Sequence, residues 1–178
     1  MPDDRAARRA LLIVYTGRGK GKTTAALGLL LRAAGRGWKV TMLQFIKAET
    51  SNYGEHRAAR RLGFELVSLG AGFTWLSENL EHDRALAEQC WAACKERLLS
   101  GDYDMVALDE FTYPLKFGWL DLDEVLTTLA ARPAHVHVVV TGRDAPERLV
   151  AAADLVTEMT EIKHPYKQGV KAQPGIEF

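Results

Sequence analysis

The chain has 178 residues, and its 23 basic and 23 acidic side chains give a formal net charge of zero. A chain of this length buries about 70% of its unfolded surface in one domain, so we expect a single domain over residues 1–178. The balanced charge argues against a nucleic-acid partner. No apolar run approaches the ~20 residues of a membrane span, and the first residues lack the apolar core of a signal peptide. We therefore expect a cytoplasmic protein that does not contact the membrane.

Strand and helix patterns alternate along the sequence. The predicted strands cover residues 11–16, 40–46, 64–69, 105–108, 136–140 and 154–159. The predicted helices run from a glycine-rich loop to residue 34, over 55–62, 80–99 and 121–131 (with Asp121 as N-cap), and onward from about 145. Continuous apolar strands such as 136–140 indicate burial on both faces, as in parallel sheets. The pattern predicts an α/β fold, a three-layer α/β/α domain with a mostly parallel central sheet.

The glycine-rich loop is the strongest motif. Residues 16–24 read Thr-Gly-Arg-Gly-Lys-Gly-Lys-Thr-Thr between a predicted strand and a predicted helix, the context of a phosphate-binding P-loop. Glycines let the backbone turn its N–H groups toward an anion, and the helix N-terminus adds its dipole. Lys22 supplies a mobile charge for phosphate oxygens. The loop predicts a P-loop NTPase-like fold that binds a nucleoside triphosphate.

This P-loop is a variant, because its first glycine is Gly17 and Thr16 stands where a glycine is usual. Arg143 follows another predicted strand, and in parallel sheets ligands bind at the carboxyl ends of strands. The predicted ATP-binding residues are Thr16, Gly17, Arg18, Gly19, Lys20, Gly21, Lys22, Thr23, Thr24 and Arg143.

Two acids end the predicted strand 105–108. Asp109 and Glu110 follow an apolar run, as expected of the metal-binding element that accompanies a P-loop. A carboxylate there can hold Mg²⁺ directly or through water, opposite the Thr23 hydroxyl. The alternative is that the acids only cap the strand or pair with a lysine. The P-loop favours the metal site, with Thr23, Asp109 and Glu110 as its candidate ligands.

Aromatic residues gather in loops rather than in strands. Phe73 and Trp75 lie in a glycine-containing loop after a predicted strand, and Tyr113 and Trp119 follow Glu110. Side chains of this kind can form an apolar wall for a flat, bulky ligand. Packing into the core is the alternative for each of them.

Other polar residues carry less information. Cys90 and Cys94 share one helix face, and we expect buried thiols rather than a metal pair or a disulfide. The histidines are scattered without metal-ligand spacing, and we expect them at the surface. The cluster Arg5, Arg8 and Arg9 is more typical of a solvated terminus than of a functional basic arm.

Several motifs in one order resemble the ATP:corrinoid adenosyltransferases of the cobalamin pathway, the P-loop type that acts on cob(I)yrinic acid a,c-diamide. The resemblance covers residues 15–178. Its motifs are the P-loop, Gln44-Phe45-Ile46-Lys47, Gly72-Phe73-Thr74-Trp75 with Asn79, Leu108-Asp109-Glu110-x-Thr112-Tyr113, Thr141-Gly142-Arg143, Lys163-His164, Gly169-Val170-Lys171-Ala172-Gln173 and Gly175-Ile176-Glu177-Phe178.

The resemblance implies a reaction in which Co(I) of a reduced corrinoid attacks the 5′ carbon of ATP and triphosphate leaves. It implies that residues 17–22 grip the triphosphate and that Thr23 and Glu110 hold Mg²⁺. Phe73 and Trp75 would line the corrinoid site and help to displace the lower axial ligand. The implied catalytic residues are Lys22, Phe73, Trp75 and Glu110, and the implied corrinoid-binding residues are Phe73, Trp75, Asn79 and Tyr113.

The resemblance also implies partners and an arrangement of the chain ends. We expect a homodimer that receives electrons from a donor protein or a flavin reductant. Residues 1–10 are expected to form a flexible arm, and residues 163–178 a tail over the active site. Two other hypotheses remain open: a conventional P-loop kinase or ATPase, and a non-catalytic module that binds nucleotide or corrinoid.

Overall fold

The computed structural model describes residues 5, 8–48, 52–70 and 80–177. In chain order the elements are β1 (Leu12–Thr16), α1 (Lys22–Gly35), β2 (Val40–Ala48), α2 (Gly54–Leu62), β3 (Glu65–Gly70), α3 (Leu80–Leu99), β4 (Met105–Asp109), α4 (Thr112–Lys116), α5 (Leu122–Ala131), β5 (His137–Thr141), α6 (Glu147–Ala152), β6 (Leu155–Glu158) and the 3₁₀ helix η3 (Pro165–Gln168).

The strands form one six-stranded sheet in the order β3-β2-β4-β5-β1-β6, and every pairing in it is parallel. Parallel neighbours cannot be joined by a tight turn, so each connection crosses over, and most of the crossovers run through helices. The carboxyl ends of the strands therefore meet at one edge. The loops after β1, β4 and β5, which carry the predicted phosphate and metal residues, lie together there.

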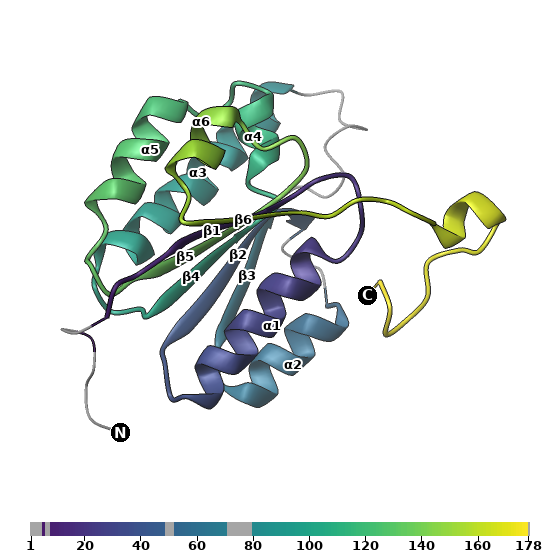
Figure 1. The fold of residues 1–178 in the computed structure, drawn as a ribbon, viewed down its shortest axis with the longest axis horizontal. Helices are drawn as coiled ribbons and strands as arrows, with labels where there is room; N and C mark the ends of the chain where they lie inside the picture. The colour runs from purple at the N-terminus through teal and green to yellow at the C-terminus, as the bar shows by residue number, and fades with distance from the viewer. Residues whose placement is uncertain (1–4, 6–7, 49–51, 71–79, 178) are drawn as a thin grey trace.

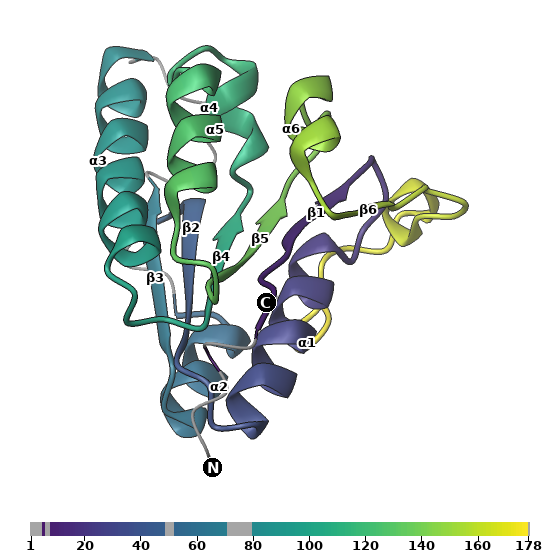
Figure 2. The same cartoon turned by 60° about the vertical axis from the view of Figure 1, so that its left-hand side comes forward.

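Helices cover both faces of the sheet (Figure 1). Helices α1 and α2 lie on one face, and α3, α4, α5 and α6 lie on the other (Figure 2). Successive strand residues point to opposite faces, so β1 sends Leu12 and Val14 into the core under α3 and α5 and sends Ile13 into the core under α1. The three-layer α/β/α prediction is confirmed, and the sheet is wholly parallel.

Helix α4 was not predicted from the sequence. Its residues, Thr-Tyr-Pro-Leu-Lys, contain Pro114, which usually interrupts a helix. Here the proline lies in the first turn, where the backbone N–H has no helical partner to lose. The predicted cap of α5 is confirmed, since Asp121 Oδ1 accepts a hydrogen bond of 2.9 Å from the Glu124 N–H.

Arg9 is exposed, as expected of the basic N-terminal cluster, but Arg5 and Arg8 are not simply solvated. Arg5 and Arg8 form ion pairs of 2.9 and 2.8 Å with the buried Asp104, and the Arg8 guanidinium lies 3.7 Å from the centre of the Trp38 ring. Asp104 also accepts from the Lys39 N–H at 2.8 Å. The arginines thus attach the start of the chain to the loops before β2 and β4.

The buried-thiol prediction is confirmed, because Cys90 and Cys94 are buried and free. The expectation that histidines lie at the surface is wrong for two of them. His56 and His137 are buried. The ring nitrogens of His56 contact the Tyr53 N–H and the Ser68 hydroxyl. His137 accepts from the Leu11 N–H and stacks on Trp38. Across the described part of the chain, no helix has the length and apolar character needed to cross a bilayer.

Replacing Asp121 with alanine should lower the free energy of unfolding by about 1 kcal/mol, because the first turn of α5 loses its side-chain acceptor. Chemical denaturation measures this loss. Thr127→Ala on the same helix is the matched control: Thr127 is exposed, and the change improves helix propensity. An Asp121→Ala variant as stable as the control would contradict the capping role.

Candidate active site

The P-loop joins β1 to α1 through glycines in the left-handed region. Gly17 has φ +91° and Gly21 has φ +104°, conformations that side chains disfavour. The loop also packs against the chain after β6: the Gly19 N–H donates to the Met159 carbonyl at 2.6 Å, and a Cβ at Gly17 would lie 2.5 Å from the same oxygen. Gly17 is therefore required both by its conformation and by the space around it.

Lys22 lies inside the curve of the loop. Its ammonium is buried and donates to the carbonyls of Gly17 and Gly19 at 2.9 and 2.6 Å. Burial lowers the pKa of Lys22, while the nearby Glu110 carboxylate opposes this shift. The positive charge of Lys22 is thus held in the turn by the backbone of the P-loop itself.

A cleft of about 720 Å³ opens at this edge of the sheet, a size typical of small-molecule sites. It brings together nine of the predicted residues: Gly19, Lys20, Gly21, Lys22, Thr23, Thr24, Glu110, Tyr113 and Arg143. The other lining residues are Leu27, Lys47, Gly54, Glu55, Ala58, Gly175, Ile176 and Glu177. Helix α2 and the end of the chain therefore contribute walls to the same cleft.

Some predicted residues lie elsewhere. Thr16, Gly17, Arg18 and Asp109 do not line the cleft, and the Thr16 hydroxyl accepts from the Ala145 N–H at 3.2 Å. Phe73, Trp75 and Asn79 fall outside the described residues.

Sequence reasoning did not assign a role to Lys47 or Glu55, which form an ion pair at the cleft wall. The motif Gln44-Phe45-Ile46-Lys47 is the signal that pointed toward Lys47.

Glu110 is held in an unusual conformation. Its φ of +58° lies in the left-handed region, which is costly for a residue with a side chain. The Glu110 N–H donates to the Thr141 hydroxyl at 2.9 Å, and this contact fixes the turn. Among the described residues the buried Oε2 atom of Glu110 has no hydrogen-bond partner.

The pKa of Glu110 is raised to about 7 by burial and, secondarily, by the neighbouring Asp109. Lys22, Arg143 and Lys47 act in the opposite direction. Burial therefore outweighs the attraction of the surrounding cations, and a further cation at Oε2 would favour the charged carboxylate.

Asp109 lies behind Glu110 and is fully buried. Thr141 Oγ1 donates to its Oδ1 at 2.7 Å, and Gln44 Nε2 donates to its Oδ2 at 3.0 Å. Both carboxylate oxygens thus already accept from the protein. This geometry favours Glu110 over Asp109 as the acid that faces a ligand in the cleft.

The residues fit a magnesium ion. An unpartnered carboxylate oxygen of Glu110 and the hydroxyl of Thr23 border one cleft, and Mg²⁺ prefers such oxygen ligands, completing its shell with water and phosphate. The described residues contain no group of three or more His, Cys, Asp or Glu side chains able to hold a metal by themselves.

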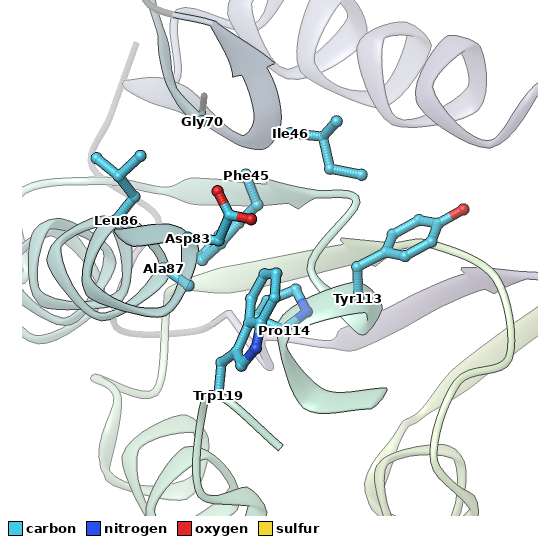
Figure 3. A pocket seen from close by; sticks show the side chains of 9 residues that line it. All are labelled: Phe45, Ile46, Gly70, Asp83, Leu86, Ala87, Tyr113, Pro114 and Trp119. Atoms are coloured by element: carbon cyan, nitrogen blue, oxygen red, sulfur yellow. The ribbon is translucent and has the colours of Figure 1, made fainter. Parts of the chain in front are cut away.

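A smaller, mostly apolar hollow lies beside the cleft (Figure 3). Its lining residues come from β2, the end of β3, α3 and the α4 region: Phe45, Ile46, Gly70, Asp83, Leu86, Ala87, Tyr113, Pro114 and Trp119. Tyr113 lines both spaces, so the hollow and the cleft are neighbours. Gly70 directly precedes the segment that contains Phe73 and Trp75.

The end of the chain contacts the P-loop. Lys20 Nζ and Glu177 Oε1 form an ion pair of 2.7 Å, and Glu177 Oε2 accepts from the Gln173 N–H at 2.8 Å. Residues 175–177 thereby form part of the cleft wall.

Glu110→Gln should stabilise the nucleotide-free protein at pH 8 and leave it nearly unchanged at pH 4. The folded pKa of about 7 exceeds the ordinary value of 4.5, so the unfolded chain loses this proton first and stability falls as the pH rises through that interval. The expected gain at pH 8 is about 3 kcal/mol, measured by chemical denaturation. Glu88→Gln, at an exposed carboxylate, is the control, and an equal effect of Glu110→Gln at both pH values would contradict the shift.

Comparison with known proteins places this site in a family. A family model described as ATP:corrinoid adenosyltransferase BtuR/CobO/CobP matches residues 8–178. A corrinoid adenosyltransferase of Pseudomonas aeruginosa is 46% identical over 172 residues, which cover 96% of this chain and 84% of that protein. The corrinoid adenosyltransferase of Escherichia coli K12 is 42% identical over 170 residues, which cover 96% of this chain and 86% of that protein.

Among solved structures, the flagellar accessory protein FlaH of Methanocaldococcus jannaschii has a TM-score of 0.54 at 10% identity, covering 84% of this chain and 70% of that one. That likeness concerns the fold alone. The sequence matches extend over nearly the whole chain and confirm the resemblance carried by the motifs. This chain therefore belongs to the family of ATP:corrinoid adenosyltransferases.

Proposed function

We propose that this enzyme transfers the 5′-deoxyadenosyl group of ATP to a reduced corrinoid. The electron pair of Co(I) forms the cobalt–carbon bond with C5′, and the C5′–O bond breaks, leaving its electrons on the triphosphate. The observation that carries the proposal is the single cleft in which the P-loop, Thr23, Glu110 and Arg143 converge. These groups suit a polyphosphate that must be stabilised as it departs.

The protein's task in this reaction lies at the leaving group. The P-loop N–H groups and the α1 N-terminus bind phosphate oxygens. When the triphosphate binds, the Lys22 ammonium donates to phosphate oxygens in place of the loop carbonyls of Gly17 and Gly19. Arg143 borders the same cleft and adds a second positive charge. Preorganised donors of this kind stabilise charge where it develops in the transition state.

Mg²⁺, held by Thr23 and Glu110, would supply further charge neutralisation on the triphosphate. The carboxylate of Glu110 favours its charged form when a cation is beside it, which suits this role. Asp109, with both oxygens engaged, supports Glu110 from behind.

The nucleophile needs protection rather than activation. Co(I) is already strongly nucleophilic, so no general base is required. A dry, apolar surface limits its oxidation and protonation. The hollow lined by Phe45, Tyr113 and Trp119 is our candidate for this surface. Gly70, which also lines it, directly precedes the sequence segment with Phe73 and Trp75, and Asn79 and Tyr113 are our candidates for further corrinoid contacts.

The proposal includes partners. A donor protein or a flavin reductant would supply the electron that converts Co(II) to Co(I). A homodimer is compatible with the exposed edge strand β6, where Leu155 and Val156 are each 40% exposed. The free, buried thiols of Cys90 and Cys94 fit a reducing, cytoplasmic setting.

Product analysis tests the reaction and separates it from a kinase or ATPase. Incubation with ATP, Mg²⁺ and chemically reduced corrinoid under anaerobic conditions should yield triphosphate and a light-sensitive cobalt–carbon chromophore. Lys22→Ala should lower turnover on the order of 100-fold, because it removes charge beside the leaving group. Formation of ADP and phosphate, or normal turnover by Lys22→Ala, would refute the proposal.

The paired change Phe73→Ala and Trp75→Ala should impair reaction from Co(II) under weak reduction far more than reaction from pre-reduced Co(I). Apolar side chains beneath the corrin ring favour loss of the lower ligand, which makes Co(II) easier to reduce. The ratio of the two initial rates is the measurement. Equal losses from both starting states would indicate general damage to the pocket instead.

A further inference from the structure

A row of buried hydrogen bonds crosses the sheet beneath the phosphate cleft. Ser68, Gln44 and Asp109 are register partners on β3, β2 and β4. Ser68 Oγ and Gln44 Oε1 are 2.8 Å apart, and Gln44 Nε2 and Asp109 Oδ2 are 3.0 Å apart. Thr141 at the end of β5 continues the row, and His56 of α2 begins it with a contact of 2.8 Å from Nε2 to the Ser68 hydroxyl.

From His56 to Asp109 the hydrogen bonds of this row all point toward Asp109, which also accepts from Thr141 on its other side. The Tyr53 N–H donates to His56 Nδ1 at 3.2 Å, so the proton of the neutral ring lies on Nε2 and is donated to Ser68. The Ser68 hydroxyl then donates to the Gln44 carbonyl oxygen, and the Gln44 amide donates to Asp109. Burial lowers the pKa of His56, which favours the neutral ring that this order requires.

Burying this row of polar side chains at the end of the sheet costs free energy of desolvation. Gln44, Ser68, His56 and Asp109 are all at least nine-tenths buried, and each loses its hydration on folding. Packing alone would be served as well by apolar residues, which occupy the preceding positions on the same face of β2 and β4, Met42 and Ala107. The polar residues begin where the sheet reaches the cleft.

The row ends at the acid that faces the cleft. Asp109 accepts from the Thr141 hydroxyl, and that hydroxyl accepts from the Glu110 N–H. These two contacts hold Glu110 in its left-handed conformation and so determine where its carboxylate points. At the other end, His56 belongs to α2, whose Gly54, Glu55 and Ala58 line the cleft.

We propose that Gln44 is a positioning residue of the nucleotide–Mg²⁺ site. Through Asp109 and Thr141 it aligns Glu110 for the metal, and through Ser68 and His56 it connects this alignment to the α2 wall of the cleft. The inference rests on the proposed function in assuming that the cleft binds ATP with Mg²⁺, and it assigns Gln44 no contact with substrate.

Gln44→Met tests the assignment, because it keeps the length of the side chain and removes both its donor and its acceptor. Calorimetric titration with ATP, in Mg²⁺ and in EDTA, measures the ratio of the two dissociation constants. We expect binding with Mg²⁺ to weaken about tenfold or more, as when the partners that orient metal ligands are removed. Binding in EDTA should change little.

Thr41→Val is the matched control. Thr41 is also buried on β2 and donates to Glu65 at 2.7 Å, but it lies toward the other end of the strand. This variant should lose stability without changing the ratio. Ser68→Ala breaks the row one hydrogen bond further from Asp109 and should change the ratio in the same direction by a smaller factor. If Gln44→Met does not fold, Ser68→Ala tests the positioning role in its place.

Equal weakening with and without Mg²⁺, or a ratio unchanged from that of the unaltered protein, would overturn the positioning role. ATP binding by the unaltered protein distinguishes failure of the proposed function from failure of the role of Gln44. If the unaltered protein binds no ATP under either condition, the proposed function itself fails. If it binds ATP with Mg²⁺ and Gln44→Met binds equally well, only the role of Gln44 fails.

Discussion

The burial of opposite charges at one edge of a parallel sheet is the constraint on which this site depends. Lys22 and Glu110 approach the same cleft from the loops after β1 and β4. Burial lowers the pKa of the lysine and raises that of the glutamate, so desolvation exceeds their mutual attraction. The triphosphate and the divalent cation that we propose for this cleft would together offer each group the opposite charge.

The backbone carries much of the cost of this arrangement. Left-handed conformations occur at Gly17 and Gly21, where glycine accepts them easily, and at Glu110, where it does not. At Glu110 the conformation is held by the hydroxyl of Thr141, a residue of the next strand. The neighbouring Gly142 has room for no side chain, because a Cβ there would lie 2.0 Å from the hydroxyl oxygen of Thr112. The turn after β4 and the turn after β5 therefore constrain each other.

The two adjoining spaces suit the two reactants of the proposed reaction. The larger cleft is lined by P-loop groups and charges, whereas the hollow beside it is lined mainly by apolar and aromatic side chains. A charged leaving group and an oxidation-sensitive nucleophile need such different surroundings. Tyr113 borders both spaces, on the short helix α4 that directly follows the turn at Glu110.

Local patterns predicted most of the elements because they depend on neighbours in the chain. The apolar run at 136–140 and the Asp121 cap are of this kind. Helix α4 was missed because Pro114 suggests a break unless its place in the first turn is known. His56 and His137 were expected at the surface because nothing local shows the partners that distant segments bring to their rings.

By itself, the sequence determined the P-loop, the acids after β4, the alternating fold and the family, since these depend on residue types at short spacings and on motifs in order. The tertiary structure decided which acid faces the cleft, the strand order and the row from His56 to Thr141. Those features depend on contacts between segments far apart in the chain. Asp109 and Glu110 are adjacent in sequence, yet only the donors from β2 and β5 distinguish the supporting acid from the one available to a ligand.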